Sequence, residues 1–427
     1  MEAQVKTFER VSAMPASTWH FLKANDATIQ IPDQLAIAPD VRISGTYATC
    51  DDAEAFAHAI DRVQKQWEVE HPAPTAEELA EREAYRAAES DATYGGTAQS
   101  AYQAHADALE DARSLMTAFE HGTGDETAMF LRSSAGRCAV VQASQNEAVE
   151  ASVIVTGTNG TISVSALDIV AMRGSSVDVH VVVDGRIEED YDGEEISGFA
   201  GTTIRVFADE DARVRITRTQ TLSGGFIDVD DMGLFAHERA TIEVRQTVLG
   251  ASSTYTGLAG DLRGDSARVD VDTRYLGHDT QSHDFNYMLR HHGTRTRCNL
   301  NANGVLAGKS RKTLRGTIDL IRGCKGAEGS ENENVLLVDE GVTNKTVPVI
   351  LCNEDDVAGN HGATIGHIRE EQLFYLESRG IPREAAEAMF VSAMFEQAVI
   401  DAPDEDSRAA VLRLGGDLIR DFCELFD

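Results

Sequence analysis

Closely spaced cysteines are missing from this sequence. Its six cysteines are scattered, at Cys50, Cys138, Cys298, Cys324, Cys352 and Cys423, and none forms a C-x-x-C pair. Short cysteine spacings are the signature of zinc knuckles, and dense cysteine frameworks are typical of small secreted domains held by disulfides. The sequence predicts neither, so any metal or sulfur chemistry must use ligands that folding or a second chain brings together.

Long apolar runs are missing as well. No stretch reaches the ~18–20 consecutive apolar residues that a membrane-spanning helix needs. The first twenty residues also lack the apolar core of a secretory signal. We therefore expect a cytoplasmic protein that has no membrane partner.

Positive charge is scarce: 38 Lys and Arg residues stand against 71 Asp and Glu, giving a formal net charge of −33. A field of that sign repels phosphate backbones and anionic lipids. The composition therefore excludes nucleic acids as favoured partners, and the simplest role for the carboxylates is to keep the protein in solution.

The middle of the chain is rich in short β-branched runs. From about residue 136 to 351 they recur roughly every ten residues between turn signals such as Gly157-Thr158-Asn159-Gly160. This pattern alone fits a sandwich, a barrel or a solenoid. The absence of helical periodicity and the alternating polar rows favour a solenoid of stacked coils, although no clean repeat fixes the coil length.

Helical periodicity is confined to the two ends of the chain. Near the N-terminus, the spacing of apolar residues predicts helices over 53–69, from Thr75 onward, and over 101–119. We therefore expect residues 1–130 to be a mostly helical region that precedes a β core over 131–358.

The C-terminal residues 359–427 are predicted to form a helical domain. Apolar residues recur at helical spacing between 368 and 400, and Gly380 and Pro382 separate this stretch into two packed helices. A further amphipathic helix is predicted over 401–427.

The stretch from Asp355 to Ala386 carries a specific pattern, D-D-V-x-x-x-H-G-A-T-x-G-x-I-x-x-E-x-L-F-Y-L-x-S-R-G-I-x-x-x-x-A. This run closely resembles the C-terminal signature of the SufB/SufD family, the scaffold proteins of the SUF iron–sulfur cluster assembly machinery. The resemblance is looser back to about Phe285 and weak over the rest of the chain.

The resemblance implies a fold and a function. Family members have a parallel β-helix core flanked by helical domains, so we expect a mainly β protein with a right-handed parallel β-helix core and α-helical regions at both ends. The implied function is that of a non-enzymatic scaffold. It would pair with a SufB-type chain or with itself and bind the SufC ABC-type ATPase through its C-terminal helices. No stably bound cofactor is implied; iron or a transient cluster would lie at the dimer interface.

His361 is the principal candidate ligand. It is predicted to lie on a turn between the last strand and the first C-terminal helix, where a neutral imidazole could ligate iron or pair with an acidic residue. A turn histidine satisfied by backbone carbonyls is the alternative. In the family the matching histidine is associated with cluster assembly at the subunit interface, so the resemblance favours the ligand.

Departures from the family pattern point to the SufD type. Many SufD-type chains have a cysteine two positions before the histidine, where this sequence has Gly359. SufB-type chains have Glu on both sides of it, and also an essential cysteine before a D-S-L-L-I-G strand; the corresponding run here starts at Asn332 and has no thiolate. A soft ligand is therefore missing at both positions. Cys324 or Cys352 could substitute if either faced the interface, although free cysteine is more often a small buried hydrophobe.

The surface predicted to bind the ATPase lies on the C-terminal helices. Its candidate residues are Leu373, Phe374, Leu376, Ile381, Met389, Phe390, Met394 and Phe395. Partner helices are commonly captured through anchors at this spacing. Part of the stripe must nevertheless pack inside the molecule, because so many apolar side chains would not stay exposed together.

A polysaccharide-active β-helix enzyme is the alternative function. Asp228, Asp230 and Asp231 on a strand-rich face would then act as acid and base. An aromatic content of 6%, with only two tryptophans, leaves few platforms for stacking on sugar rings.

Overall fold

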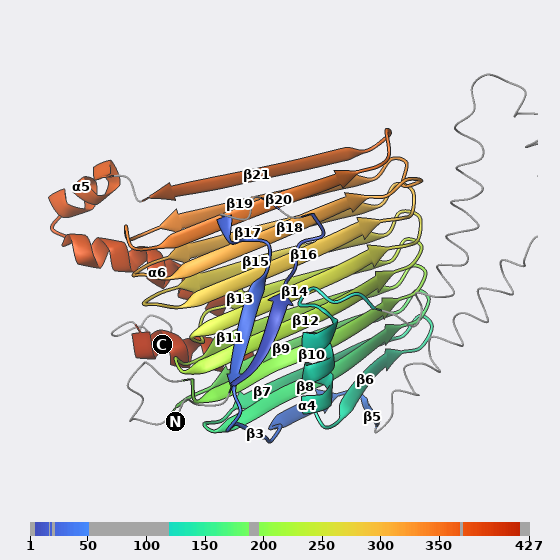
Figure 1. Ribbon diagram of the computed structural model, residues 1–427, viewed down its shortest axis with the longest axis horizontal. Coiled ribbons are helices and arrows are strands. Elements are labelled where there is room, and N and C mark those ends of the chain that lie inside the picture. The colour runs from blue at the N-terminus through green and yellow to red at the C-terminus, as the bar shows by residue number, and fades with distance from the viewer. Residues whose placement is uncertain are drawn as a thin grey trace, which may run out of the picture.

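The computed structural model describes residues 5–16, 18, 22–50, 119–187, 196–367 and 370–418. Its main feature is a β-solenoid whose coils each contribute one strand to each of two facing parallel sheets (Figure 1). The even sheet contains β6 (Cys138–Ala143), β8 (Thr161–Ala171), β10 (Gly198–Ala208), β12 (Phe226–Ala236), β14 (Ser253–Leu262), β16 (Ser282–His291), β18 (Arg311–Leu320) and β20 (Thr343–Cys352). The odd sheet contains β7 (Ala148–Gly157), β9 (Ser176–Gly185), β11 (Arg213–Leu222), β13 (Thr241–Val248), β15 (Arg268–Gly277), β17 (Arg297–Leu306), β19 (Glu328–Leu337) and β21 (Ala358–His367).

Neighbouring coils stack in register, but the number of residues per coil varies. Ile227 of β12 pairs with Ser253 of β14, 26 residues later, whereas Ile162 of β8 pairs with Phe199 of β10, 37 residues later. This variation explains why no repeat of fixed length is visible in the sequence. Alternate side chains of every strand point into the lumen between the sheets, where they form one continuous apolar core.

The N-terminal residues cap the first coil and run along the outer face of the even sheet as far as β20, where Lys345 Nζ donates a hydrogen bond to the Lys23 carbonyl oxygen. The short strands β4 (Val41–Gly45) and β5 (Ala48–Cys50) pair antiparallel with β7 and β6, and β3 (Ala36–Ile37) pairs with β8. The antiparallel hairpin of β1 (Val5–Val11) and β2 (Ala27–Pro32) lies with helix α4 (Asp125–Ser134) over the outer face of the even sheet (Figure 1). There Phe8 and Phe130 pack against Phe199 and Ile162.

Three C-terminal helices follow the last strand: α5 (Glu370–Ser378), α6 (Arg383–Asp401) and α7 (Glu405–Leu418). Gly380, at φ +86°, separates α5 from α6, as the sequence predicts. Phe395 and Val399 of α6 and Val411 of α7 pack against residues of the odd sheet, among them Leu276. No helix of the described residues is long and apolar enough to span a membrane.

The mainly β fold with a parallel β-helix core is confirmed, with two corrections. The solenoid extends beyond residue 358, because 358–367 form β21 and the first C-terminal helix starts only at Glu370. Residues 5–50 contain strands β1–β5 where a mostly helical region is predicted. The N-terminal helices predicted between residues 53 and 118 lie outside the described residues.

Candidate functional site

The last coil of the solenoid is uncovered. β20 and β21 are the terminal strands of the two sheets, and every residue of β21 except Gly366 is exposed. Strand β12, in the middle of the solenoid, is buried along its whole length. Terminal strands leave unpaired backbone N–H and C=O groups, which can pair with another chain. This end is therefore the part of the solenoid most suited to receive a partner strand.

His361 lies within β21 rather than on a turn, which corrects the prediction. It is exposed and pairs in register with Glu331 of β19. The sequence suggests a turn because Gly359, Asn360 and Gly362 are weak strand formers, but pairing with β19 overrides this local preference. Because in-register neighbours share a face, His361 faces the lumen side of the sheet with Glu331.

Glu331 is a buried carboxylate that the sequence analysis missed. Its side chain is directed at Gly316 on the opposite sheet, where a Cβ would stand only 2.3 Å from Oε1. Glu331 is 3% exposed, and neither of its oxygens has a hydrogen-bond partner among the described residues. Burial raises its pKa to about 7; nearby Glu333 acts in the same direction and Lys312 opposes it.

Glu333, two residues further along β19, is fully engaged. Tyr275 Oη donates a hydrogen bond of 2.9 Å to its Oε1, and Lys312 Nζ and the Thr346 hydroxyl also donate to it. Burial lowers the pKa of Lys312, which Glu333 partly offsets. The two lumenal glutamates therefore differ in their hydrogen bonding: Glu333 accepts from three donors, whereas Glu331 accepts from none of the described residues. The alternating S-E-N-E-N run, which leaves β19 no apolar face at this point, is the signal that could have revealed them.

The two candidate thiols differ in access. Cys324 is wholly buried in the turn between β18 and β19, and burial raises its pKa to about 11. Cys352 is exposed at the end of β20, with its Sγ 3.3 Å from the Glu354 carbonyl oxygen. Cys324 thus fits the alternative of a small buried hydrophobe, and only Cys352 is accessible. The described residues contain no cluster of three or more His, Cys, Asp or Glu side chains able to hold a metal ion.

The predicted stripe on the C-terminal helices divides into exposed and buried residues. Phe374 and Met389 are 72% and 51% exposed, as is the neighbouring Tyr375 at 55%, which the prediction omitted. The other members with described side chains are buried or partly buried: Leu373, Leu376, Ile381, Met394 and Phe395. The side chain of Phe390 lies outside the described residues.

The carboxylates named for the alternative enzyme are all buried. Asp228 and Asp230 face the lumen, where Arg218 Nη2 lies 2.7 Å from Asp228 Oδ1 and Arg218 Nε lies 3.2 Å from Asp230 Oδ1. Asp231 faces the opposite way and accepts hydrogen bonds from the backbone and hydroxyl of Thr123. None can reach a polymer, so these residues cannot serve as acid and base for a polysaccharide.

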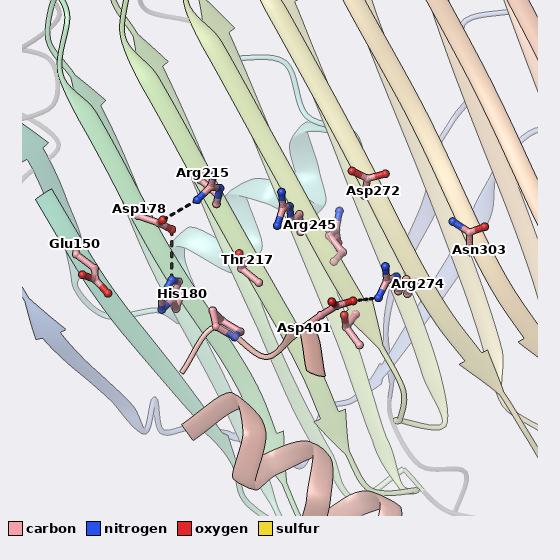
Figure 2. A pocket seen from close by; sticks show the side chains of 13 residues that line it. Glu150, Asp178, His180, Arg215, Thr217, Arg245, Asp272, Arg274, Asn303 and Asp401 are labelled. Atoms are coloured by element: carbon pink, nitrogen blue, oxygen red, sulfur yellow. Dashed lines mark hydrogen bonds and ion pairs between the residues drawn. The ribbon is translucent and has the colours of Figure 1, made fainter. Parts of the chain in front are cut away.

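A polar groove of about 720 Å³ lies on the outer face of the odd sheet, next to the link between α6 and α7 (Figure 2). Its charged side chains largely pair with one another. Asp178 contacts both His180, at 3.3 Å, and Arg215, at 3.4 Å, while Arg274 pairs with Asp401 at the end of α6.

The same surface attaches the C-terminal helices to the odd sheet. Asp404, between α6 and α7, lies 3.3 Å from His180 Nδ1 and 3.4 Å from the Ser152 hydroxyl. Arg413 of α7 pairs with Asp184. Hydrogen bonding to Asp178 first, and then the charges of Asp178 and Asp404, raise the pKa of His180 above its ordinary value. We use the name ionic attachment for four contacts: Asp404 with His180, Asp404 with Ser152, Arg413 with Asp184, and Arg274 with Asp401.

Comparisons with known proteins agree on one family. The model of the SUF system FeS cluster assembly, SufBD core domain, matches residues 153–394, more than half of the chain. The match runs from within β7 to within α6 and includes both Glu331 and His361.

Curated relatives carry the same description. An iron–sulfur cluster assembly SufBD family protein of Mycobacterium tuberculosis is 29% identical over 202 residues, 47% of this chain and 24% of the relative. The iron–sulfur cluster assembly protein SufD of Bacillus subtilis is 26% identical over 201 residues, 47% of this chain and 46% of that protein. A chloroplastic SufBD family protein of Arabidopsis thaliana is 25% identical over 245 residues, 56% of this chain and 43% of the relative. The matches span less than half the length of each relative.

Proposed function

Because the chain belongs to the SufBD family of the SUF iron–sulfur cluster assembly system, we propose that it is a SufD-like, non-enzymatic scaffold subunit of a cytoplasmic cluster assembly complex. The observation that carries the proposal is the last coil of the solenoid, which presents His361 on β21, an exposed strand with one unpaired edge. Iron or a nascent cluster is the cargo of this scaffold.

The partner at the uncovered coil is a SufB-type chain or a second copy of this chain. The edges of β20 and β21 offer backbone donors and acceptors for strand pairing. Ile365, 48% exposed on β21, adds apolar area to the same edge. A second chain docked here would lie beside His361 and could supply the ligands that a single chain lacks.

The partner at the C-terminal helices is a SufC-type ABC ATPase. Phe374 and Tyr375 of α5 and Met389 of α6 present large apolar side chains to solvent, and such residues commonly insert into a groove of a partner. Motion of the ATPase would reach the solenoid through the ionic attachment and the apolar contacts of α6 and α7.

Co-purification tests both partnerships. The full chain, co-expressed with SufC-type and SufB-type proteins, should retain both through a size-exclusion column. Phe374→Asp and Met389→Asp should release the ATPase, whereas Ile400→Asp, at the equally exposed end of α6 (69%), is the matched control and should retain it. The proposed function would be refuted if the wild-type chain retained neither the SufC-type nor the SufB-type protein.

Cargo handling is tested at His361. His361→Ala should lower the iron and sulfide content of the anaerobically purified complex without releasing either partner, because the residue is exposed and makes no core contact. An unchanged iron and sulfide content would remove His361 from the proposal.

A further inference from the structure

His180 joins the odd sheet to the link between α6 and α7. Its Nε2 lies 3.3 Å from Asp178 Oδ1, on the same strand β9, and its Nδ1 lies 3.3 Å from Asp404 Oδ2, on the link. Figure 2 shows the contact with Asp178 at the edge of the polar groove. One imidazole ring therefore lies between two carboxylates, one from the solenoid and one from the helical region.

This arrangement requires a charged ring. A neutral imidazole carries one N–H group and one bare lone pair, whereas an imidazolium carries two N–H groups. With a carboxylate at each nitrogen, only the imidazolium attracts both of them, because a neutral ring turns its lone pair toward one of the two. His180 is 9% exposed, so solvent compensates a lost contact only in part.

The other groups around His180 favour the same charge. Its in-register neighbours on β7 and β11, Ser152 and Thr217, are uncharged. Arg215 of β11 is engaged by Asp178 and Glu243. His180 lines both the polar groove and a second groove beside the start of α7, and these contain the further charged side chains Glu150, Arg245, Asp272, Arg274, Asp401, Glu405 and Asp406. Most of them are carboxylates, which stabilise a positive charge on the ring.

We propose that protonation of His180 controls how firmly α6 and α7 are held against the odd sheet. The imidazolium bridges Asp178 and Asp404. When one proton leaves the ring for solvent, one of these carboxylates loses its partner and the link loosens. The apolar contacts of Phe395 and Val411 do not titrate, so the helices loosen without detaching.

The sign of the effect follows from this arrangement. The bridge is complete below the ordinary histidine pKa of about 6.5. It is lost as the pH rises through the higher pKa that His180 has while the helices are attached. The inference goes beyond the proposed function and does not depend on it, because it concerns contacts within this chain alone.

Hydrogen–deuterium exchange of the full-length chain at pH 6.0 and 8.5 measures the attachment, with labelling times corrected for the intrinsic effect of pH on exchange. In the wild type, corrected exchange of α6 and α7 should be about two- to fivefold faster at pH 8.5, the range expected for one partly exposed ion pair. Corrected exchange of the β core should change less.

Two variants remove the bridge in different ways. His180→Gln lacks the titrating group, so corrected exchange of α6 and α7 should be fast at both pH values. Asp404→Asn keeps the histidine and removes the charge on the link, and should reduce the pH effect as well. His292→Gln is the matched control, because His292 pairs with Asp261 at 3.1 Å in the turn after β16 of the even sheet. This variant should keep the wild-type pH effect.

Nuclear magnetic resonance follows the proton itself. The His180 Cε1–H signal, assigned by its absence from His180→Gln, should titrate above pH 6.5 in the wild type and at a lower pH in Asp404→Asn. Equal corrected exchange of the wild-type helices at both pH values would overturn the inference. So would an undiminished pH effect in His180→Gln, or a His180 signal that titrates at the same pH with and without the Asp404 carboxylate. None of these results bears on the proposed function, which is tested by retention of the partner proteins.

Discussion

The two ends of the solenoid are built in opposite ways. At the first coil, short antiparallel strands pair with β6 and β7, and a helix and a hairpin cover the even sheet. At the last coil, no described strand pairs with the outer edges of β20 and β21, and nearly all of β21 is exposed; the loop between β1 and β2 reaches β20, where Lys345 Nζ donates a hydrogen bond to the Lys23 carbonyl oxygen. Described strands of this chain therefore close the sheet edges at the first coil and not at the last. The difference supports the proposal that the last coil receives a second chain.

Asp168 is the clearest marker of the covered end. Its carboxylate, 1% exposed, accepts two hydrogen bonds of 3.1 Å from Arg132 of α4 and two of 2.8 and 2.7 Å from Arg205 of β10. Burial alone would raise the pKa of Asp168, but the hydrogen bonds and charges of the two arginines hold it below its ordinary value. One carboxylate thus fixes a helix to two strands.

The largest expected effect comes from removing that carboxylate. Asp168→Ala leaves two guanidinium groups without their partner and should lower the free energy of unfolding by about 3–5 kcal/mol. Urea denaturation followed by circular dichroism measures the change. Asn360→Ala, on exposed β21, is the counterpart at the other end and should stay within about 0.5 kcal/mol of the wild type. Similar losses at both ends would contradict the contrast between them.

The buried interior of the solenoid should make the protein sensitive to acid. Burial lowers the pKa of His283, a lumenal residue of β16, to about 4. Between this value and the ordinary pKa of about 6.5, the unfolded chain binds more protons than the folded one, so stability falls as the pH drops through that window. The loss from this residue should reach about 3 kcal/mol at most.

His283→Phe should remove this part of the pH dependence, because phenylalanine does not titrate and the neighbouring Tyr275 and Phe285 already form an aromatic cluster. Chemical denaturation at pH 7, 5.5 and 4.5 measures the slope for the variant and the wild type. An equally steep fall in the variant would show that other groups cause the acid sensitivity.

The uncovered end should control association. Ile365→Lys places a charge on the exposed edge of β21 and should weaken pairing with a second chain at least tenfold, about 1.4 kcal/mol. Sedimentation velocity over a range of concentrations measures it. Ile37→Lys is the matched control, because Ile37 is similarly exposed, at 58% against 48%, but lies on β3 at the covered end. Equal weakening by both variants would assign the effect to charge alone.

The smallest expected effect concerns the ionic attachment beside the groove. Asp404→Asn weakens the contacts with His180 and Ser152 and should lower stability by about 1 kcal/mol or less, since such partly exposed pairs contribute little. Hydrogen–deuterium exchange should become faster in α6 and α7 and stay unchanged in the β core. Asp406→Asn, whose contact with exposed Arg42 is 3.7 Å, should change exchange less. Faster exchange throughout the core would mean that the helices support the whole solenoid.

The elements set by local chemistry could be predicted from the sequence. β-Branched runs mark the strands of the core, and Gly380 and Pro382 mark the break between α5 and α6. β21 could not be predicted in the same way, because its Gly and Asn residues are weak strand formers and it exists by pairing with β19.

The site depends on contacts between coils, which the sequence does not reveal. His361 stands out by resemblance, but its neighbour Glu331 follows from a register between residues 30 positions apart. Because the number of residues per coil varies from 26 to 37, no spacing rule identifies that neighbour. Asp228 and Asp231 likewise look equivalent in the sequence, although one faces the lumen and the other the opposite side of the strand.

The stacking of coils also limits how such a molecule can change in evolution. Each coil adds one strand to each of the two sheets, so gain or loss of a whole coil preserves the pairing of the remaining strands. A shift of one residue within a strand would instead move every lumenal side chain to the outer face. Solenoids of different length can therefore keep the same first and last coils.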